Sequence, residues 1–548
     1  MGILSPSNLF KKNRSSGETN TESVQTPEEQ TREHERAIIE LKRTRNSLLN
    51  IYKLPPELLG DIFRRNVAPM IDFSRWPNWI DRTHNFLFVC HRWFEISTHT
   101  PEVWGFWGTS LKEWKLCCRH SGSAPLDLVL DGNPDDGDFD LDLRKILQDR
   151  ATKDTIRQIC LRAEDRELLN SVISSLTVNR EGFQSSSLES FTLLNRGAGF
   201  VDLPNFFAHC RFPKLQHLEL SRNTTVQWSS LSFRTGALTT LIVDYDFYST
   251  DPIAFIPTAS ERLSMLASNP ALEKVRLDMV PPLDGSMSSV RVSLHNLKHL
   301  GLAGDVRDVL GVLHLLDHPS ELDLSLSLYN CAVGDISRIV SPYLRDYVGR
   351  RSRPQNGLGV YLIGGGDVIG YNVSDVDTLD PSKPSNQMPC FLFVYLSLDE
   401  MIPDDLLERA IMDSLAHIPQ EEVVYFCAFK EPLAMEAMSA HFPNIKVLRL
   451  ERSLLSVLSN LSGDREIFPS LQHIYLDYVV VDDDDWSPLT TFLARLTSSG
   501  NQLDTLEIFY SPHMCVEVVE KIRKVVRHFR TEPPNKKIWC PFDTCPDP

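Results

Sequence analysis

The chain has 548 residues, of which 42% are hydrophobic and 24% charged, and its formal net charge at pH 7 is −17. This length supplies material for at least two folded units. The acidic excess argues against a nucleic-acid binder, whose affinity depends on neutralising phosphates. The sequence contains no apolar run of about 18 residues and no apolar signal core near its start. We therefore expect a protein of the cytoplasm, the nucleus or both, which binds no membrane.

The first 52 residues divide into two segments of different composition. Residues 1–32 are rich in Ser, Thr, Glu, Gln and Asn. Such a segment has too few apolar groups to offset the entropy of ordering, so we predict a disordered leader. In residues 33–52, apolar and long side chains fall at helical spacing and predict a charged amphipathic helix. We expect this helix to be a short coiled coil or a brace for the segment that follows.

A second helix is predicted to begin at Pro55 and Pro56. Proline fixes a backbone angle suited to a helix start, and its missing N–H costs nothing in the first turn. Glu57 adds negative charge near the positive end of the helix dipole. The apolar residues that follow have spacings that make one broad face. These residues are Leu58, Leu59, Ile62 and Phe63.

A third helix is predicted over residues 86–97, where apolar side chains recur in steps of three and four. Thr100-Pro101 ends it, because the residue before a proline is pushed away from helical angles. Neither helix is long enough to bury its apolar face alone, so we expect the two to pack on each other. Two interpretations of the apolar residues stay open. They form either the core of a small helical domain or a face that binds a partner.

Four short patterns follow one another along residues 53–105. Leu54-Pro55-Pro56-Glu57 comes first, then Ile62-Phe63, then Val89-Cys90-x-x-Trp93, and Pro101-x-x-Trp104 comes last. In order and chemistry this series resembles an F-box. The charged helix before it and the stretch Trp76-Pro77-Asn78-Trp79-Ile80 are similar to one fungal group of F-box proteins.

The resemblance implies a docking module that carries no chemistry of its own. In the F-box family this module binds a Skp-type adaptor of a cullin ubiquitin ligase, and the rest of the chain selects a target protein. One departure is residues 66–85, which are longer and richer in Pro and Trp than the middle of a compact F-box, so we expect the helix there to be interrupted. By resemblance, the adaptor-binding residues are Leu54, Pro55, Pro56, Glu57, Leu58, Ile62, Phe63, Val89 and Trp93.

Beyond about residue 150 the pattern L-x-x-L-x-L recurs at intervals of roughly 23 to 34 residues, overlapping the range of leucine-rich repeats. An alternating strand cannot bury its apolar face in isolation, but stacked strands backed by helices share a continuous core. In three copies the pattern extends to F-P-x-L-x-x-L-x-L with little change. The copies lie at 188–193, 212–220, 238–243, 270–277, 294–302, 319–326, 442–450, 468–476 and 503–508.

The predicted fold class is therefore α/β, with a short all-helical F-box followed by an irregular leucine-rich-repeat-like α/β solenoid. The predicted segments are a leader at 1–32, a helix at 33–52, an F-box-like domain at 53–110, a solenoid at 111–535 and a tail at 536–548.

The repeat pattern weakens at about 329–441. Residues 359–363 and 391–398 are predicted to be two strands joined by a long polar loop, and residues 423–427 another strand. Gly364-Gly365-Gly366-Asp367 indicates a tight hairpin-like turn rather than a dinucleotide site, because it lacks the glycine spacing that starts a binding helix.

A basic run lies near the C-terminus and is predicted to be the solvated side of a terminal helix. The run comprises Lys521, Arg523, Lys524, Arg527 and Arg530. His217, His299 and His473 each fall inside a repeat, which indicates a recurring structural position rather than separate catalytic sites.

Catalytic motifs are absent from the sequence. It has no G-x-S-x-G, no phosphate loop and no H-E-x-x-H helix. Its 11 cysteines are scattered and odd in number, which fits thiols in a reducing compartment. The four aspartates at 482–485 are expected to form a solvated acidic loop. We expect no metal and no cofactor.

The function expected from the sequence is target recognition without catalysis. The F-box would bind a Skp-type adaptor and cullin ligase, and the solenoid would hold an unknown target protein. A second interpretation is a leucine-rich interaction scaffold that is tethered through the F-box without ubiquitin transfer. A third is an enzyme within the irregular segment 329–441.

Overall fold

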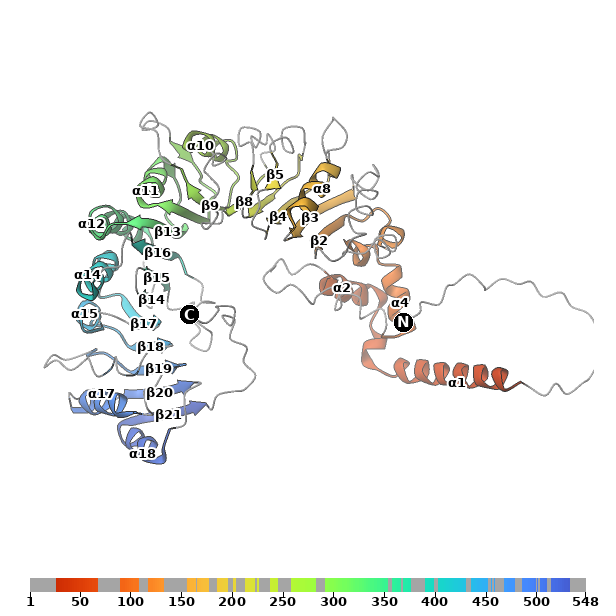
Figure 1. The fold of residues 1–548 in the computed structure, drawn as a ribbon. Helices are drawn as coiled ribbons and strands as arrows, with labels where there is room; N and C mark the ends of the chain where they lie inside the picture. Colours follow the sequence, from red (N-terminus) through yellow and green to blue (C-terminus); the bar gives the residue numbers. More distant parts are fainter. Residues whose placement is uncertain are drawn as a thin grey trace, which may run out of the picture. The chain divides into compact units, whose positions relative to one another are not determined.

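The protein is described here from a computed structural model that forms two compact units. The first comprises Met1–Phe106 and Cys117–Gly122, and the second comprises Trp107–Leu116 and Ser123–Pro548. Figure 1 shows both units as ribbons. The structure describes residues 26–67, 89–107, 117–132, 155–163, 165–176, 185–195, 201–203, 212–221, 224–225, 237–244, 258–281, 291–352, 357–365, 368–375, 390–398, 403–429, 435–451, 455, 458, 468–478, 485–498, 500, 503–509 and 514–532.

The described part of the first unit is helical. Its elements include α1 (Pro27–Ser47), the 3₁₀ turn η1 (Asn50–Lys53), α2 (Pro56–Val67), α4 (His91–Thr98) and the 3₁₀ turn η4 (Pro101–Trp104), and residues 117–121 are helical as well. The predicted start of α2 at the proline pair and the end of α4 before Pro101 are confirmed. The helix predicted from residue 86 begins at His91, and residues 86–88 and 76–80 lie outside the described ranges.

Helix α1 begins earlier than the sequence patterns predicted. The Thr26 side chain accepts a hydrogen bond from the Glu29 backbone N–H, and the Glu29 carboxylate accepts one from the Thr26 N–H. This capping box starts the helix at Pro27, so the prediction of disorder for the leader is wrong for residues 27–32. The helix ends at Ser47, and a 3₁₀ turn replaces the helix predicted up to Tyr52.

A small aromatic core holds α2, α4 and η4 together. The Phe63 and Trp93 rings have centroids 5.1 Å apart. Trp104 is buried, and its Nε1–H donates a hydrogen bond of 2.6 Å to the Ser97 carbonyl. Leu59 is buried beside them. The expectation that the two short helices pack on each other is therefore confirmed.

The second unit contains nearly all of a large and mostly parallel sheet, and in chain order helices connect many of its strands. The boundary between the two units falls within β1, after Phe106. The strands are β1 (Phe106–Trp107), β2 (Leu126–Gly132), β3 (Ile156–Ala163), β4 (Ser190–Asn195), β6 (His217–Ser221), β8 (Thr240–Asp244), β9 (Lys274–Val280), β11 (His299–Asp305), β13 (Asp323–Cys331), β14 (Leu358–Gly365), β15 (Val368–Asp375), β16 (Leu392–Leu398), β17 (Val423–Phe429), β18 (Val447–Glu451), β19 (His473–Asp477), β20 (Leu503–Phe509) and β21 (Val526–Glu532). The short pairs β5 (Val201–Asp202) with β7 (Thr224–Thr225) and β10 (Val292–Ser293) with β12 (Leu316–Asp317) form two small sheets.

Helices of the second unit lie along one side of this sheet (Figure 1). They are α8 (Arg166–Leu176), α10 (Ala259–Ala267), α11 (Val306–Leu315), α12 (Val333–Asp335), the π-helical turn η7 (Ile336–Val340), α13 (Ser341–Arg350), α14 (Asp404–Leu415), α15 (Met435–His441), α17 (Ser487–Ser498) and α18 (Val516–Val525). The mixed α/β fold class is therefore as predicted.

Each of the nine predicted repeat strands is present, and neighbouring repeats pair in parallel. The order β2, β3, β4, β6, β8, β9, β11 and β13 follows the chain, and so does the order β17 to β21. Along β13, alternate residues such as Leu324, Leu326 and Leu328 are buried, while the residues between them lie on the other, open face. The period of two in the sequence is thus the period of burial.

The repeated Phe-Pro motif forms a turn at the entrance to its strand. Each phenylalanine is buried, and its carbonyl accepts a hydrogen bond from the backbone N–H three residues later. The bonds join Phe212 to Leu215, Phe442 to Ile445 and Phe468 to Leu471. The aromatic ring therefore closes the core at the point where the chain turns into the sheet.

The strand order changes in the irregular segment. β13 pairs with β16 in parallel, β16 pairs with β15 and β15 with β14 in antiparallel, and β14 pairs with β17 in parallel. The prediction of strands joined only by a loop is wrong, because β15 lies between β14 and β16. Its buried hydrophobic residues are Ile369, Tyr371 and Val373, so it lacks the leucines of the repeats. The predicted hairpin is confirmed by the pairing of Gly365 with Val368, and residues 376–389 lie outside the described ranges.

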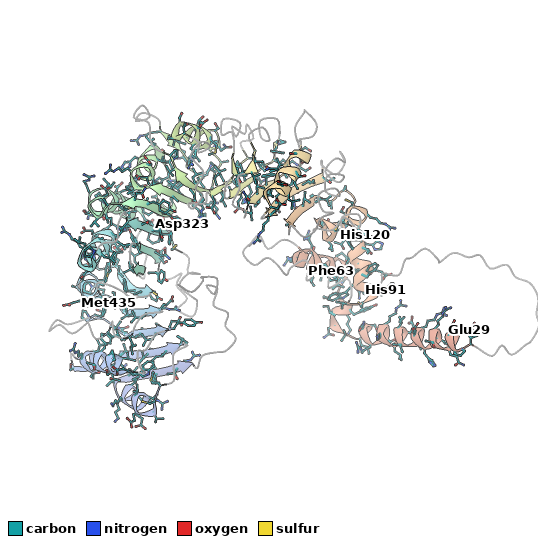
Figure 2. The ribbon with its side chains drawn as sticks, in the orientation of Figure 1. Glu29, Phe63, His91, His120, Asp323 and Met435 are labelled. Carbon is teal, nitrogen blue, oxygen red and sulfur yellow. The ribbon has the colours of Figure 1, made fainter. Side chains whose placement is uncertain are left out.

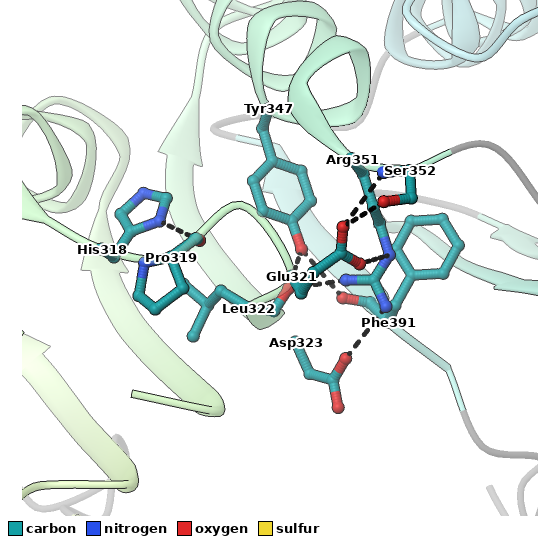
Figure 3. Close-up of polar contacts among 9 residues, drawn as sticks. All are labelled: His318, Pro319, Glu321, Leu322, Asp323, Tyr347, Arg351, Ser352 and Phe391. Carbon is teal, nitrogen blue, oxygen red and sulfur yellow. Dashed lines mark hydrogen bonds and ion pairs between the residues drawn. The ribbon is translucent and has the colours of Figure 1, made fainter. Parts of the chain in front are cut away.

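Tyr347 on α13 links the entrances of β13 and β16 (Figure 3). Its hydroxyl donates to the Leu322 carbonyl and lies 3.2 Å from the Phe391 carbonyl. The Arg351 guanidinium donates to the same Leu322 carbonyl at 2.9 Å and lies 4.2 Å above the Phe391 ring. These contacts fix the position at which β16 returns beside β13.

The C-terminal basic run lies on two elements. Lys521, Arg523 and Lys524 lie on α18 as predicted, but the helix ends at Val525. Arg527 and Arg530 lie on β21, so the prediction of a helix is wrong for them. Val526 is buried and opens a strand that pairs in parallel with β20, because the edge of the sheet offers backbone partners there. Tail residues 536–548 lie outside the described part.

Candidate functional site

Helix α2 carries two apolar stripes that face different ways. Leu59 and Phe63 are 0% and 1% exposed and belong to the core of the first unit. Leu58 and Ile62 are 50% and 38% exposed. Because each pair is four residues apart, each forms a stripe along the helix, one directed inward and one outward. The single broad face expected from the sequence is thus divided between packing and an exposed surface.

The other residues expected to bind the adaptor lie mainly at the surface. Pro55, Pro56 and Glu57 are exposed at the start of α2, and Val89 is exposed just before α4. Leu54 and Trp93 are half-buried. Phe63 differs from all of these because it is buried against Trp93, so we place it in the core of the unit.

Arg92 positions the chain that leads into α2, and the sequence patterns did not single it out. Its Nη2 donates a hydrogen bond of 2.6 Å to the Leu54 carbonyl, and its guanidinium lies 4.6 Å from the centre of the Tyr52 ring. In the sequence, the only feature that pointed to this role was that Arg92 stands next to Trp93. Through these contacts α4 holds the residues that precede the outward stripe.

Exposed apolar side chains are concentrated in the first unit. Among the described residues, ten of the thirteen exposed large hydrophobic side chains belong to it. They are Ile38, Ile39, Leu41, Leu48, Leu49, Ile51, Leu58, Ile62, Val89 and Phe94. Phe63 on α2 and His91 on α4 are labelled in Figure 2. Contiguous patches of exposed apolar side chains are typical of protein-protein interfaces.

The open face of the large sheet carries charged groups. A pocket of about 410 Å³ is lined by residues of β9, β11, β13 and the start of β16. Arg276 crosses it above Gly301, where an added Cβ would lie 3.2 Å from the arginine Cγ. The Arg276 guanidinium lies 3.6 Å from the Asp278 carboxylate and 4.0 Å from that of Asp244. Burial, and then a hydrogen bond with Asp244, raises the pKa of Asp278 to about 7.

Replacing Asp278 with Asn is expected to stabilise the protein at pH 8 but not at pH 4. The folded-state pKa of Asp278 lies above its unfolded value, so its contribution to stability is present below about pH 4 and is lost as the pH rises through about 7. An amide avoids this loss, and we expect a gain of about 2 kcal/mol at pH 8.

Urea unfolding of both proteins at the two pH values measures this difference. Asp323→Asn is the control, because Asp323 (labelled in Figure 2) lies on the same face and pairs with His299 at 3.0 Å. An Asp278→Asn effect that does not change with pH would contradict the assignment.

The recurring histidines occupy equivalent places, as predicted. His217, His299 and His473 are each the first residue of a strand, and the rows of paired residues place His217 and His299 on the same row of the open face. Asp485 accepts hydrogen bonds from the backbone and side chain of Ser487 at the start of α17, while residues 482–484 lie outside the described part. Within the described ranges, no three His, Cys, Asp or Glu side chains gather as metal ligands do.

In the segment 329–441, the described titratable groups with the strongest burial lie in the core. His417 lies against Tyr371, with ring centroids 5.7 Å apart, and burial lowers the pKa of His417 to about 3. The Tyr371 hydroxyl donates to the Ser414 carbonyl. Burial also raises the pKa of Tyr371, so both side chains are neutral at pH 7.

Two comparisons with known proteins find no match. No protein-family model matches this chain, and no curated protein does. Among the described helices, none is both long enough and apolar enough to cross a bilayer.

Proposed function

We propose that this chain is a substrate-receptor subunit of a Skp-cullin-F-box ubiquitin ligase. In this proposal α2 and α4 form the F-box and bind the adaptor. The repeat sheet is an irregular leucine-rich-repeat-like solenoid that holds a target protein. The receptor acts by proximity, since it brings the target close to the ligase's charged carrier enzyme and needs no catalytic residue of its own.

The observation that carries the proposal is the outward stripe of α2. Leu58 and Ile62, which the resemblance to an F-box assigns to the adaptor contact, are exposed. Leu59 and Phe63 beside them are buried. A helix that served only as a core element would direct its apolar residues to one side. The stripe, together with the other exposed apolar residues of the first unit, supports adaptor docking.

Target binding is proposed for the open face of the repeat sheet. One face of the strands packs on helices, while the other presents side chains in rows across the strands. The pocket at Arg276 combines both signs of charge with the Phe393 and Tyr329 side chains. Such a mixed surface suits a polar protein segment better than a small apolar ligand.

Binding of purified chain to a Skp-type adaptor tests the proposal. Leu58→Asp with Ile62→Asp is expected to weaken binding about 100-fold or more, because two carboxylates would be buried in an apolar contact. Both positions are exposed, so the variant is expected to fold. The matched control is Leu406→Asp, an equally exposed leucine on α14 of the second unit, which should bind as the wild type does.

Absence of wild-type binding would overturn the proposal, and so would equal binding by the double variant. Where the adaptor binds, blocking the ligase or the proteasome separates the receptor from the scaffold interpretation. Abundance of the captured partner rises for a receptor and stays constant for a scaffold.

A further inference from the structure

A basic groove lies on the helical side of the second unit, between α11 and α13. It has a volume of about 740 Å³. Its charged lining consists of four arginines and two aspartates, with two histidines beside them, although the whole chain carries 73 acidic and only 56 basic residues. The cations are Arg291, Arg307, Arg338 and Arg350, and the histidines are His314 and His318. The groove therefore carries net positive charge on a chain whose net charge is negative, and this favours an anionic ligand.

A buried carboxylate pairs with two of these arginines. The Asp335 carboxylate is largely buried and lies 2.9 Å from the Arg338 guanidinium and 3.5 Å from that of Arg307. One carboxylate thus holds two guanidinium groups near each other, which leaves an excess of positive charge. Arg338 lies on the π-helical turn η7. Such turns are rare in proteins as a whole, but many of those that occur lie at functional sites.

A tyrosine hydroxyl in the groove has no acceptor among the described residues. Tyr343 on α13 lines the groove and is 9% exposed, and its hydroxyl makes no hydrogen bond within the described structure. Burial raises the pKa of Tyr343 to about 12, so the group stays protonated at pH 7 and can donate. A buried hydroxyl without a partner is costly, and an anion in the groove would supply its acceptor.

The two histidines are oriented alike. The Nδ1–H of His314 donates to the Leu310 carbonyl at 2.7 Å, and that of His318 donates to the Pro319 carbonyl at 2.9 Å. In each ring this bond uses Nδ1 and leaves Nε2 outside it.

We propose that this groove binds a phosphate monoester, with Arg338 and Arg350 as its cationic ligands and the Tyr343 hydroxyl as a neutral donor. Guanidinium groups match phosphate oxygens in pairs, and a phosphate offers more acceptor oxygens than a carboxylate. Arg350 is paired with exposed Asp346, and an exposed pair of this kind exchanges readily with a stronger anion. The site is independent of adaptor docking, because all its residues lie in the second unit.

Binding of inorganic phosphate to the full chain tests the proposal. Phosphorus NMR line broadening and thermal unfolding are measured at fixed ionic strength, with chloride and succinate as reference anions. Phosphate is expected to bind where the reference anions do not. Arg338→Gln with Arg350→Gln should weaken phosphate binding about tenfold or more. Arg345→Gln is the matched control, because Arg345 is exposed on the same helix but does not line the groove, and it should bind as the wild type does.

Tyr343→Phe separates binding from packing. Loss of the hydroxyl is expected to weaken phosphate binding about threefold to tenfold while leaving the unfolding temperature of the free protein unchanged or higher. Equal effects of phosphate and chloride would overturn the proposal, and so would unchanged phosphate affinity in both groove variants. Free phosphoserine and a phosphoserine peptide, each compared with its unphosphorylated form, identify the source. Equal affinities of the two indicate a small phosphate compound, and tighter peptide binding indicates a modified protein segment.

Discussion

Arg449→Met is expected to destabilise the second unit by about 3–5 kcal/mol. Arg449 lies on β18 with its side chain 5% exposed. Its Nε lies 2.7 Å from the Glu451 carboxylate, and its Nη2 lies 2.6 Å from that of Asp477 on β19. Removing the guanidinium leaves two carboxylates with little exposure and no cation between them. The loss therefore comes mainly from the remaining charges, and less from the missing side chain.

Urea unfolding followed by circular dichroism measures this loss. Arg527→Met is the matched control, because Arg527 pairs with Asp504 at 2.9 Å on the same sheet but is well exposed, and its replacement should cost less than about 1 kcal/mol. The triple change Arg449→Met, Glu451→Leu and Asp477→Leu should recover most of the stability, since no charge is left buried. A single variant no less stable than the control would contradict this account.

Phe63→Ala is expected to unfold the first unit while the second unit stays folded. Removing a buried phenylalanine costs about 3–5 kcal/mol. A small helical unit has little stability beyond that amount. The ring of Phe63 is 1% exposed and packs on Trp93, so the variant loses the central aromatic contact between α2 and α4.

Hydrogen exchange resolved by peptide measures this outcome. Amides of α2 and α4 should lose protection in the variant, and those of the repeat strands should keep it. Leu58→Ala is the control, because Leu58 lies on the same helix but is exposed, and it should leave protection unchanged. Retained protection in α2 of Phe63→Ala would show that this aromatic contact does not hold the unit together.

The repeat strands could be predicted from the sequence because one signal recurs. In each copy a period of two in the leucines coincides with alternate burial in the sheet, as Leu324, Leu326 and Leu328 show. Strand β15 could not be found in this way. Its buried hydrophobic residues are Ile369, Tyr371 and Val373, which carry the same period without the leucines. Its place between β14 and β16 depends on pairing between distant strands, and no local pattern contains that information.

The candidate docking surface was predictable in part. The proline pair and the spacing of apolar residues located α2, but the same spacing could not separate Leu58 and Ile62 from Leu59 and Phe63. The aromatic contact with Trp93 decides which stripe turns inward, and that contact requires α4 to be in place. Helix α1 was mispredicted at its start because the capping box formed by Thr26 and Glu29 lies within a polar segment.

The altered strand order at β14 to β16 has a consequence for how the second unit assembles during synthesis. From β2 to β13, each strand of the large sheet pairs with the strand of that sheet made just before it and can add to a growing edge. The free edge of β13 must then wait for β16, since Leu324 pairs with Leu392, 68 residues further along the chain. During that interval an unpaired leucine-rich strand is exposed, and this is the kind of edge through which chains aggregate. Tyr347 links the entrances of β13 and β16. Variants that disturb this contact are therefore the first in which aggregation and dependence on chaperones should be measured.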